Sequence, residues 1–530
     1  MNNKNKLYRI CALTCITIIT FSACTGDLNV TPIDPSTNTP SNTLTSTEKY
    51  DQLLAKCYSA FSVSSPDGSS GSPDIDGIDG GFGQYLRAYF NCQELPTDEC
   101  IMGWNDQTIK DLHGLQWTSS DVFVSAMYYR IMYEVSLCDE VIRQINNSSI
   151  KDPKMEQYKA EARCIRALAY LQAIDLYGNV PFTDETSSVG GTKPSQIKRS
   201  DLFSWLENEL KSLAEDDNLP ANPEKYRAGK GMAYMMLAKL YLNAKVYTGI
   251  VKYTECAETC KKILELGYQL ESQSNYFNMF GADNDQFQGI GHEIIFSIYQ
   301  DHINTQAYGG TTYIINSETG GSMDYLNLIG LGGAGWGGLR VTPEFVDLFQ
   351  SSDIRGKRFY TNGQNKDIKD IGTFTDGYAY YKFTNKKANG SNVTNINSFT
   401  DTDFPIYRLA DVYLMLAECQ VVGGVNVNID GHNGIYYFNE IRKRAGAQII
   451  ASPTANDIIQ ERGRELAWEG HRRTDLVRFG QLTSNNYLWS YKGMNSNTGD
   501  PHAVDNKFNL YPLPASEITA NTNLTQNSGY

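Results

Sequence analysis

The stretch from Asp79 to Gln107 combines flat aromatic rings with polar and charged groups in a way that could bind a sugar. Its aromatic members are Tyr85, Tyr89, Phe90 and Trp104, and its polar members are Asp79, Arg87, Asn91, Asp98 and Gln107. Sugar rings have apolar C–H faces and hydroxyl edges, which suit aromatic rings placed beside amide, guanidinium and carboxylate groups. The alternative is a segment that packs its aromatic side chains into the core.

The local structure predicted for this stretch is mostly ordered loop. No helical or strand period continues along it, it opens on glycines, and Pro96 interrupts it. A plain connecting loop has no reason to carry four large rings. We therefore treat the stretch as a candidate carbohydrate-binding segment.

Composition excludes some classes of function. The chain has 530 residues with 12% aromatic residues, 34 of them Tyr, and a formal net charge of −14. Because no basic cluster follows the first ten residues, the cationic surface that nucleic acid requires is missing from the sequence pattern. The same charge balance argues against electrostatic attachment to anionic lipid.

The N-terminus has the pattern of a signal peptide over residues 1–23. Lys4, Lys6 and Arg9 precede an uncharged run of 14 residues from Ile10 to Ala23, short of the roughly 20 that span a bilayer. The run ends in 21–24, Phe-Ser-Ala-Cys, which resembles the lipobox of bacterial lipoproteins. It predicts a lipid-anchored Cys24 followed by a flexible tether over 24–45. The alternative is an ordinary secreted protein in which Cys24 is incidental.

The remaining cysteines suggest structural roles. They are Cys57, Cys92, Cys100, Cys138, Cys164, Cys256, Cys260 and Cys419, and none forms a CxxC motif. We predict buried thiols. A Cys92–Cys100 disulfide is the alternative, which the sequence leaves open.

Apolar periodicity predicts a mostly α fold with a loop-rich insertion. Helices are expected at 46–61, 121–146, 153–177, 201–216, 227–244, 251–266, 407–422, 435–445 and 455–478. The segment 233–257 resembles a tetratricopeptide repeat, in which stacked helical hairpins bury a continuous apolar seam. Between 267 and 404 Gly, Asn, Asp and Tyr dominate, so we predict loops with a few short strands there.

One helical segment places acidic and basic residues together. Between Glu461 and Asp475 they lie three and four positions apart and can pair along a helix. Glu and His occur there side by side, which could also indicate catalysis. We predict a salt-bridge network that fixes helix packing.

Several segments together resemble the SusD/RagB family of outer-membrane glycan-binding lipoproteins. They are 162–170, 177–182, 438–446, 465–480 and 511–514. The resemblance implies one domain over 46–530, with about four tetratricopeptide-like helix pairs mainly in 46–266 and 405–480. The ligand-binding loops would lie mainly in 62–120 and 267–404. It further implies a lipoprotein on the outer face of the outer membrane, which captures an oligosaccharide without cleaving it for a SusC-like TonB-dependent transporter.

Three loops, 72–77, 90–100 and 308–313, resemble the starch-binding member of that family, which implies an α-glucan ligand. The positions that match its glycan-binding residues are Asp79, Arg87, Trp104, Tyr308 and Trp336. Two positions depart from it: Met102 stands where that member has a second Trp, and Gln107 replaces an Asn. The acidic residues Asp283, Asp285, Glu293 and Asp401 resemble its calcium site, although they lack the spacing of an EF-hand.

Two other functions fit parts of the pattern. A glycoside hydrolase would need two carboxylates about 5–10 Å apart across a sugar, and Asp and Glu are plentiful enough to supply them. No HExxH, GxSxG or P-loop motif is present in the sequence. A peptide-capturing member of the same family is the second alternative, because helical repeats often bind peptides.

Overall fold

The computed structural model describes residues 39–494 and 500–530, and the chain divides into two compact units, Met1–Lys49 and Tyr50–Tyr530. The predicted signal peptide, Cys24 and the first part of the predicted tether lie outside the described residues. Within the tether, 40–43 form a single helical turn, α2 (Pro40–Thr43), which starts on a proline as helices often do. Helix α3 (Thr47–Ala60) begins at the end of the first unit.

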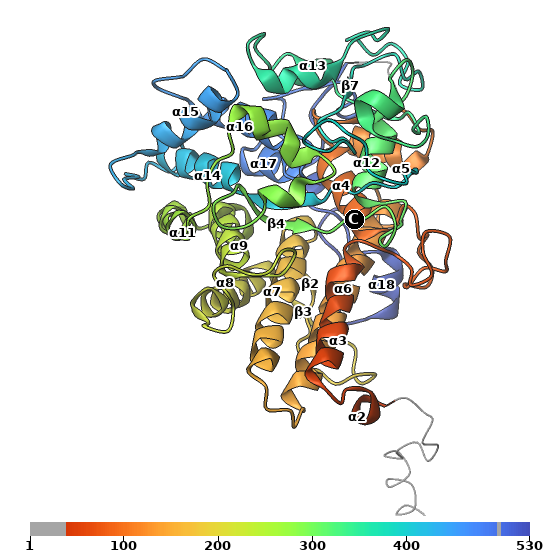
Figure 1. The fold of residues 1–530 in the computed structure, drawn as a ribbon, viewed down its shortest axis with the longest axis vertical. Helices are drawn as coiled ribbons and strands as arrows, with labels where there is room; N and C mark the ends of the chain where they lie inside the picture. The colour runs from red at the N-terminus through yellow and green to blue at the C-terminus, as the bar shows by residue number, and fades with distance from the viewer. Residues whose placement is uncertain (1–38, 495–499) are drawn as a thin grey trace, which may run out of the picture. The chain divides into compact units, whose positions relative to one another are not determined.

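The second unit is built on a row of helices, each packed on the next (Figure 1). In order of packing they are α6 (Val122–Asn146), α7 (Pro153–Leu176), α8 (Arg199–Glu215), α9 (Lys230–Leu242), α11 (Tyr253–Glu265), α14 (Leu409–Val421) and α15 (Gly434–Arg444). The Asp121 carboxylate caps α6 by accepting from the amides of Phe123 and Val124. Asp152 caps α7 in the same way, and Pro153 occupies its first position. The predicted mostly α, repeat-like fold is confirmed.

The stretch predicted as loop contains two helices, so that prediction is wrong. Helix α4 (Tyr85–Glu94) and helix α5 (Gln107–Gly114) flank the short strand β1 (Ile101–Met102). Nine of the ten residues of α4 are buried, polar ones included, so no exposed face marks the helical period in the sequence. The Gln84 side chain caps α4 by accepting from the Arg87 amide.

The helix predicted over 455–478 is also broken in two. Helix α16 (Ala455–Leu466) ends before a turn, and α17 (Arg472–Arg478) follows it. Trp468 and Gly470 in the turn have φ of 61° and 79°, values that end a right-handed helix. A Cβ on Gly470 would lie 3.1 Å from the Cδ1 atom of Tyr89, so the close approach of α4 also favours glycine here.

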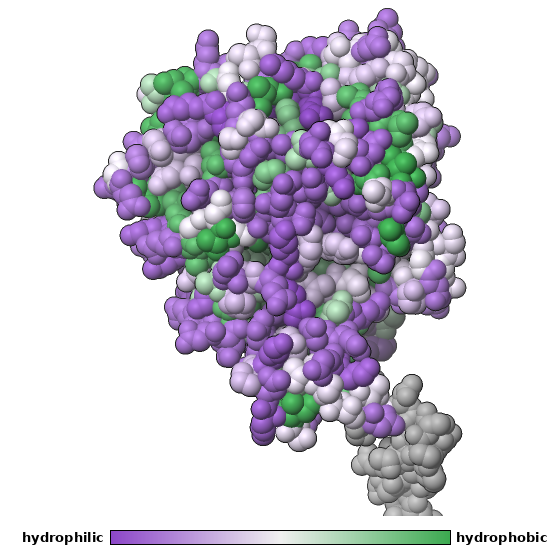
Figure 2. Space-filling model, viewed as in Figure 1, coloured by the Kyte–Doolittle hydropathy of each residue, from purple (hydrophilic) through white to green (hydrophobic). Residues whose placement is uncertain are grey.

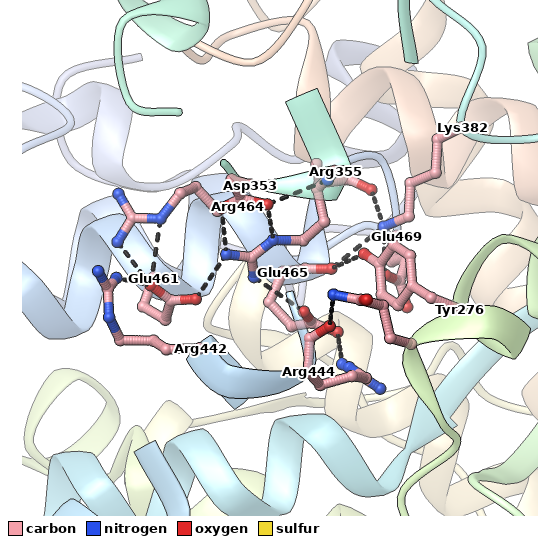
Figure 3. A network of polar contacts seen from close by, with 12 residues as sticks. Tyr276, Asp353, Arg355, Lys382, Arg442, Arg444, Glu461, Arg464, Glu465 and Glu469 are labelled. Carbon is pink, nitrogen blue, oxygen red and sulfur yellow. Dashed lines mark hydrogen bonds and ion pairs between the residues drawn. The ribbon is translucent and has the colours of Figure 1, made fainter. Parts of the chain in front are cut away.

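The acidic and basic residues of α16 form the predicted salt-bridge network (Figure 3). Glu465 bonds to Arg355 at 2.9 Å, to Arg408 at 2.6 Å and to Arg444. Its carboxylate is fully buried, as is that of Glu461, which binds Arg355 at 2.8 Å. The network joins α16 to the loop-rich part of the chain. The structural interpretation of this segment is therefore confirmed.

The region 267–404 is loop-rich, as predicted, with short strands that pair antiparallel. The described two-stranded pairs are β1 with β5 (Leu339–Arg340), β2 (Val180–Pro181) with β3 (Gln196–Ile197), β4 (Ile294–Ile298) with β8 (Phe404–Arg408), and β6 (Phe359–Tyr360) with β7 (Ala379–Tyr380). Helix α12 (Gly310–Glu318) and helix α13 (Pro343–Val346) also lie in the region 267–404. The remaining short α-helices are α10 (Ala244–Thr248) and α18 (Ala515–Ala520). Short 3-10 helices occur at Gln273–Phe280, Asn284–Phe287, Ile354–Arg358 and Asn506–Asn509, and a π-helical turn at Tyr325–Ile329.

The eight cysteines from Cys57 onward are buried free thiols, which confirms the structural prediction and excludes the Cys92–Cys100 disulfide from this structure. In the described part of the chain, no helix is both long and apolar enough to cross a bilayer. The face shown in Figure 2 is mainly hydrophilic, with separate hydrophobic patches.

Candidate functional site

A short strand pair brings two distant tryptophans together. In the antiparallel pair of β1 and β5, Met102 lies opposite Leu339, and the Gly103 amide donates to the Gly338 carbonyl at 3.0 Å. Trp104 follows β1 and Trp336 precedes β5. The Trp104 indole Nε1 donates to the Gly337 carbonyl at 3.1 Å, which fixes the ring beside the glycine-rich loop of residues 330–338.

Helix α12 positions the other side of the site. Tyr308 lies just before the helix, and the glycine-rich loop returns to its C-terminal end. There the amides of Trp336 and Gly338 donate to the carbonyls of Asn316 and Ser317, both at 2.7 Å. These bonds use carbonyls that a helix end leaves without intrahelical partners. Tyr308 thus lies just before the start of α12, and the loop that carries Trp336 is bound to its end.

Four side chains form a continuous row of rings, which we call the aromatic row: Trp104, Trp336, Tyr308 and Phe399. The ring centroids of Trp104 and Trp336 are 6.4 Å apart, those of Trp336 and Tyr308 6.1 Å, and those of Tyr308 and Phe399 5.7 Å. Tyr308 is 40% exposed, and the other three are partly exposed. A row of exposed rings on ordered backbone can stack against successive sugar faces.

Arg87 and Asp79 lie beside the row and supply polar groups. The Arg87 guanidinium donates to the Tyr308 carbonyl at 3.0 Å and covers the ring of Tyr313 at 4.4 Å. Burial lowers the pKa of Arg87, while Tyr313 and Asp79 act to raise it. The Asp79 Oδ1 atom accepts from the amides of Gly81 and Phe82 at 2.8 and 3.0 Å, and its side chain is exposed. Its other oxygen remains an acceptor for a hydroxyl group.

The structure contradicts the assignment of Met102 to the glycan surface. Met102 is 0% exposed, because it lies in strand β1 under the glycine-rich loop. A Cβ on Gly338 would lie 2.7 Å from the Trp104 Nε1 atom, so the glycine-rich loop packs directly on Trp104 and on Met102. Met102 therefore supports the aromatic row from below and cannot touch a ligand on it.

Gln107 is exposed but has no described contact with the aromatic row. It is the first residue of α5, and its Nε2 atom donates to the Asp111 carboxylate at 2.8 Å. Its role in binding stays a prediction.

The other aromatic rings of the stretch from Asp79 to Gln107 belong to the core. Two further rings of the site were not predicted from the sequence. Tyr85, Tyr89 and Phe90 are at most 8% exposed, so the alternative interpretation holds for them. Sequence reasoning did not find Phe399 or Tyr313. Phe399 stands alone among polar residues, between Ser398 and Thr400, and that isolation was an available signal.

The four acidic residues of the predicted calcium site are engaged elsewhere. Glu293 is buried between Arg408 and Arg444, at 2.8 and 2.7 Å. Asp285 pairs with Lys225, Asp401 with His302, and Asp283 accepts from the Ala388 amide. Among the described residues, no three of these carboxylates bring their oxygens within 4.8 Å of one another. Calcium binding stays a prediction, and Glu293 is committed to the ionic network.

Comparisons with a family model and with known protein sequences all match SusD or SusD-like proteins. Residues 356–530 match the model of the SusD family. The chain is 32% identical over 561 aligned residues to the starch-binding protein SusD of Bacteroides thetaiotaomicron, covering 96% of each chain. It is 26% identical to the SusD-like protein P25 of Formosa agariphila, over 80% of this chain and 82% of that protein.

Solved structures share the fold. A SusD superfamily protein from Parabacteroides distasonis superposes with a TM-score of 0.70 at 20% identity, over 92% of this chain and 100% of that one. The surface glycan-binding protein A from Bacteroides thetaiotaomicron, solved in complex with laminarihexaose, gives a TM-score of 0.67 at 19% identity. That match covers 91% of this chain and 99% of the other.

Proposed function

Since this chain belongs to the SusD family, we propose that it is a cell-surface protein that binds oligosaccharides on its aromatic row and does not cleave them. The observation that carries the proposal is the row itself. Trp104, Tyr308, Trp336 and Phe399 come from four separate places in the chain, yet their rings follow one another at 5.7–6.4 Å.

The strength of such a site follows from its parts. A pair of stacked aromatic rings contributes roughly 0.5–1.5 kcal/mol beyond the buried area, and we take the same range for a ring stacked on a sugar. Several stacked rings, a hydrogen bond donated by Arg87 and one accepted by Asp79, less the cost of ordering the ligand, correspond to a dissociation constant on the order of micromolar to millimolar. A polymer with many repeated sites raises the effective affinity further.

We propose an α-glucan as the ligand, because the 32% identical relative is named for starch binding. Isothermal titration against maltoheptaose, pullulan, dextran and a fructan tests the class. We expect measurable heat with maltoheptaose and pullulan and none with the fructan. Binding of the fructan alone would overturn the α-glucan assignment, and binding of none of the four would overturn glycan capture of this class. Chromatography of the oligosaccharide after long incubation with the protein distinguishes binding from hydrolysis, because we expect the oligosaccharide to be recovered intact.

We also propose that Cys24 carries a lipid that anchors the protein to the outer membrane, where a SusC-like TonB-dependent transporter receives the glycan. Several acyl chains on one residue give stable anchoring. We expect the Cys24→Ser variant to move from the membrane fraction to the soluble fraction while keeping its affinity for maltoheptaose. A variant that stays in the membrane fraction would refute the anchor. Co-purification of a TonB-dependent transporter with the tagged wild-type protein in mild detergent checks the partner.

A further inference from the structure

A groove of about 440 Å³ is lined by tyrosines from three separate segments of the chain, and we call it the tyrosine groove. Tyr58 belongs to α3, Tyr226 to the loop before α9, and Tyr299 directly follows β4. Binding sites for small ligands measure roughly 300–1,000 Å³ and have mostly apolar walls, so this groove has a suitable size and lining. The described lining contains none of the four residues of the aromatic row.

Two of these rings meet in a wall that solvent reaches. The ring centroids of Tyr226 and Tyr299 are 4.9 Å apart, and the ring planes are inclined by 61°. Tyr299 is 36% exposed, and Tyr226 is partly exposed. Aromatic rings that remain in contact with water while their backbone is ordered offer flat apolar faces to a ligand.

The backbone at Tyr226 is held in a conformation that costs free energy. Its φ is 65°, in the left-handed region that a bulky residue rarely adopts. On one side, Lys225 pairs with Asp285 at 2.8 Å. On the other side, Arg227 pairs with Glu161 at 2.8 Å. Strained residues that their surroundings hold in place are concentrated at ligand-binding sites, so the strain points to a ligand independently of the groove itself.

The groove presents no unbalanced charge to a ligand. Of its described lining residues only Arg227 is charged, and its guanidinium pairs with Asp51 at 2.9 Å and with Glu161. Burial raises the pKa of Tyr299 to about 12 and also raises the pKa of Tyr226, so both hydroxyls are neutral at pH 7. An uncharged sugar ring with apolar C–H faces suits such walls, whereas a sulfated or uronic sugar would find no unpaired cation in the described lining.

We propose that the tyrosine groove is a second glycan-binding site, in which a sugar ring of a neutral glucan packs against Tyr299 and Tyr226. The proposal rests on the proposed function and adds a second contact with the same class of ligand. A polymer has enough sugar units to occupy two sites, and linking two weak binding events raises the overall affinity. The groove therefore contributes most to the binding of polymeric glucan.

The test uses a protein whose aromatic row is disabled by Trp336→Ala and Tyr308→Ala together. Its residual binding is measured by affinity electrophoresis in native gels that contain soluble starch. We expect weak retardation to remain, and we expect Tyr299→Ala in the same protein to reduce it to background. In the protein with an intact row, Tyr299→Ala should lower the affinity for soluble starch about two- to tenfold, the range of one stacked ring. Tyr299→Phe keeps the ring face and should bind starch as the wild type does.

Tyr436→Ala is the matched control. Tyr436 on α15 is also partly exposed, stacks on His432 at 3.8 Å, and lines neither the tyrosine groove nor the aromatic row. It should leave starch binding unchanged. Complete loss of starch binding in the row-disabled protein overturns the second site and leaves the proposed function standing. Starch binding that Tyr299→Ala leaves unchanged in both proteins does the same. A wild type that binds no starch overturns both the α-glucan assignment and the second site.

Discussion

Replacing Trp336 by alanine is expected to lower the affinity for the bound glycan by about 10- to 100-fold, more than any other single change in the aromatic row. Trp336 has a ring neighbour on each side, Trp104 at 6.4 Å and Tyr308 at 6.1 Å. Removing it therefore interrupts the row in the middle. Isothermal titration with maltoheptaose, or migration in a starch-containing native gel, measures the loss.

The fold should tolerate this substitution. The Trp336 ring is partly exposed, and the loop is held by its backbone, with the Trp336 amide donating to the Asn316 carbonyl at 2.7 Å. Trp205→Ala is the control, because Trp205 packs against Tyr170 and Phe182 away from the row. It should leave glycan binding at the wild-type level. A Trp336→Ala protein with an unchanged melting temperature and unchanged affinity would refute the site.

The second large effect is on stability. Glu465→Gln removes a fully buried charge that three arginines share, namely Arg355, Arg408 and Arg444. Removing one partner from a buried ionic network leaves the others uncompensated and costs about 3–5 kcal/mol of the free energy of unfolding. Urea denaturation at pH 7 measures the change. Glu265→Gln, at an exposed carboxylate on α11 paired with Lys262, is the control and should change stability little. Equal stability of Glu465→Gln and wild type would contradict the importance of the network.

This stabilisation should depend on pH in a defined direction. Burial alone would raise the pKa of Glu465, but Arg444, Arg408 and Arg355 hold it well below its usual range. Arg355, Arg464 and Arg442 likewise lower the pKa of Glu461, to about 2, against the effect of burial. A carboxylate with a lowered folded-state pKa stabilises the fold above its unfolded-state pKa, about 4.3, and loses that contribution as the pH falls below it. The difference between wild type and Glu465→Gln should therefore shrink between pH 5 and pH 3.

The sequence by itself determined the helical scaffold and the nature of the ionic segment. Long helices such as α6 and α7 show a clear apolar period and capped ends, and these are local signals. The pairing of Glu461 and Arg464 follows from their spacing on one helix. Trp104 was also singled out, by the composition of its stretch, whereas Tyr308 and Trp336 were singled out on a resemblance and not on spacing.

The tertiary structure decided which of those residues meet and which face solvent. Helix α4 was missed because burial on nearly every side hides its period, and Met102 was misplaced because its exposure depends on the distant strand β5. The aromatic row brings together residues more than 200 positions apart. Such contacts depend on how the loops pack on α12, and local sequence patterns carry no information about that packing. Periodicity and capping report interactions within a few residues, whereas a binding surface is defined by what the rest of the chain leaves uncovered.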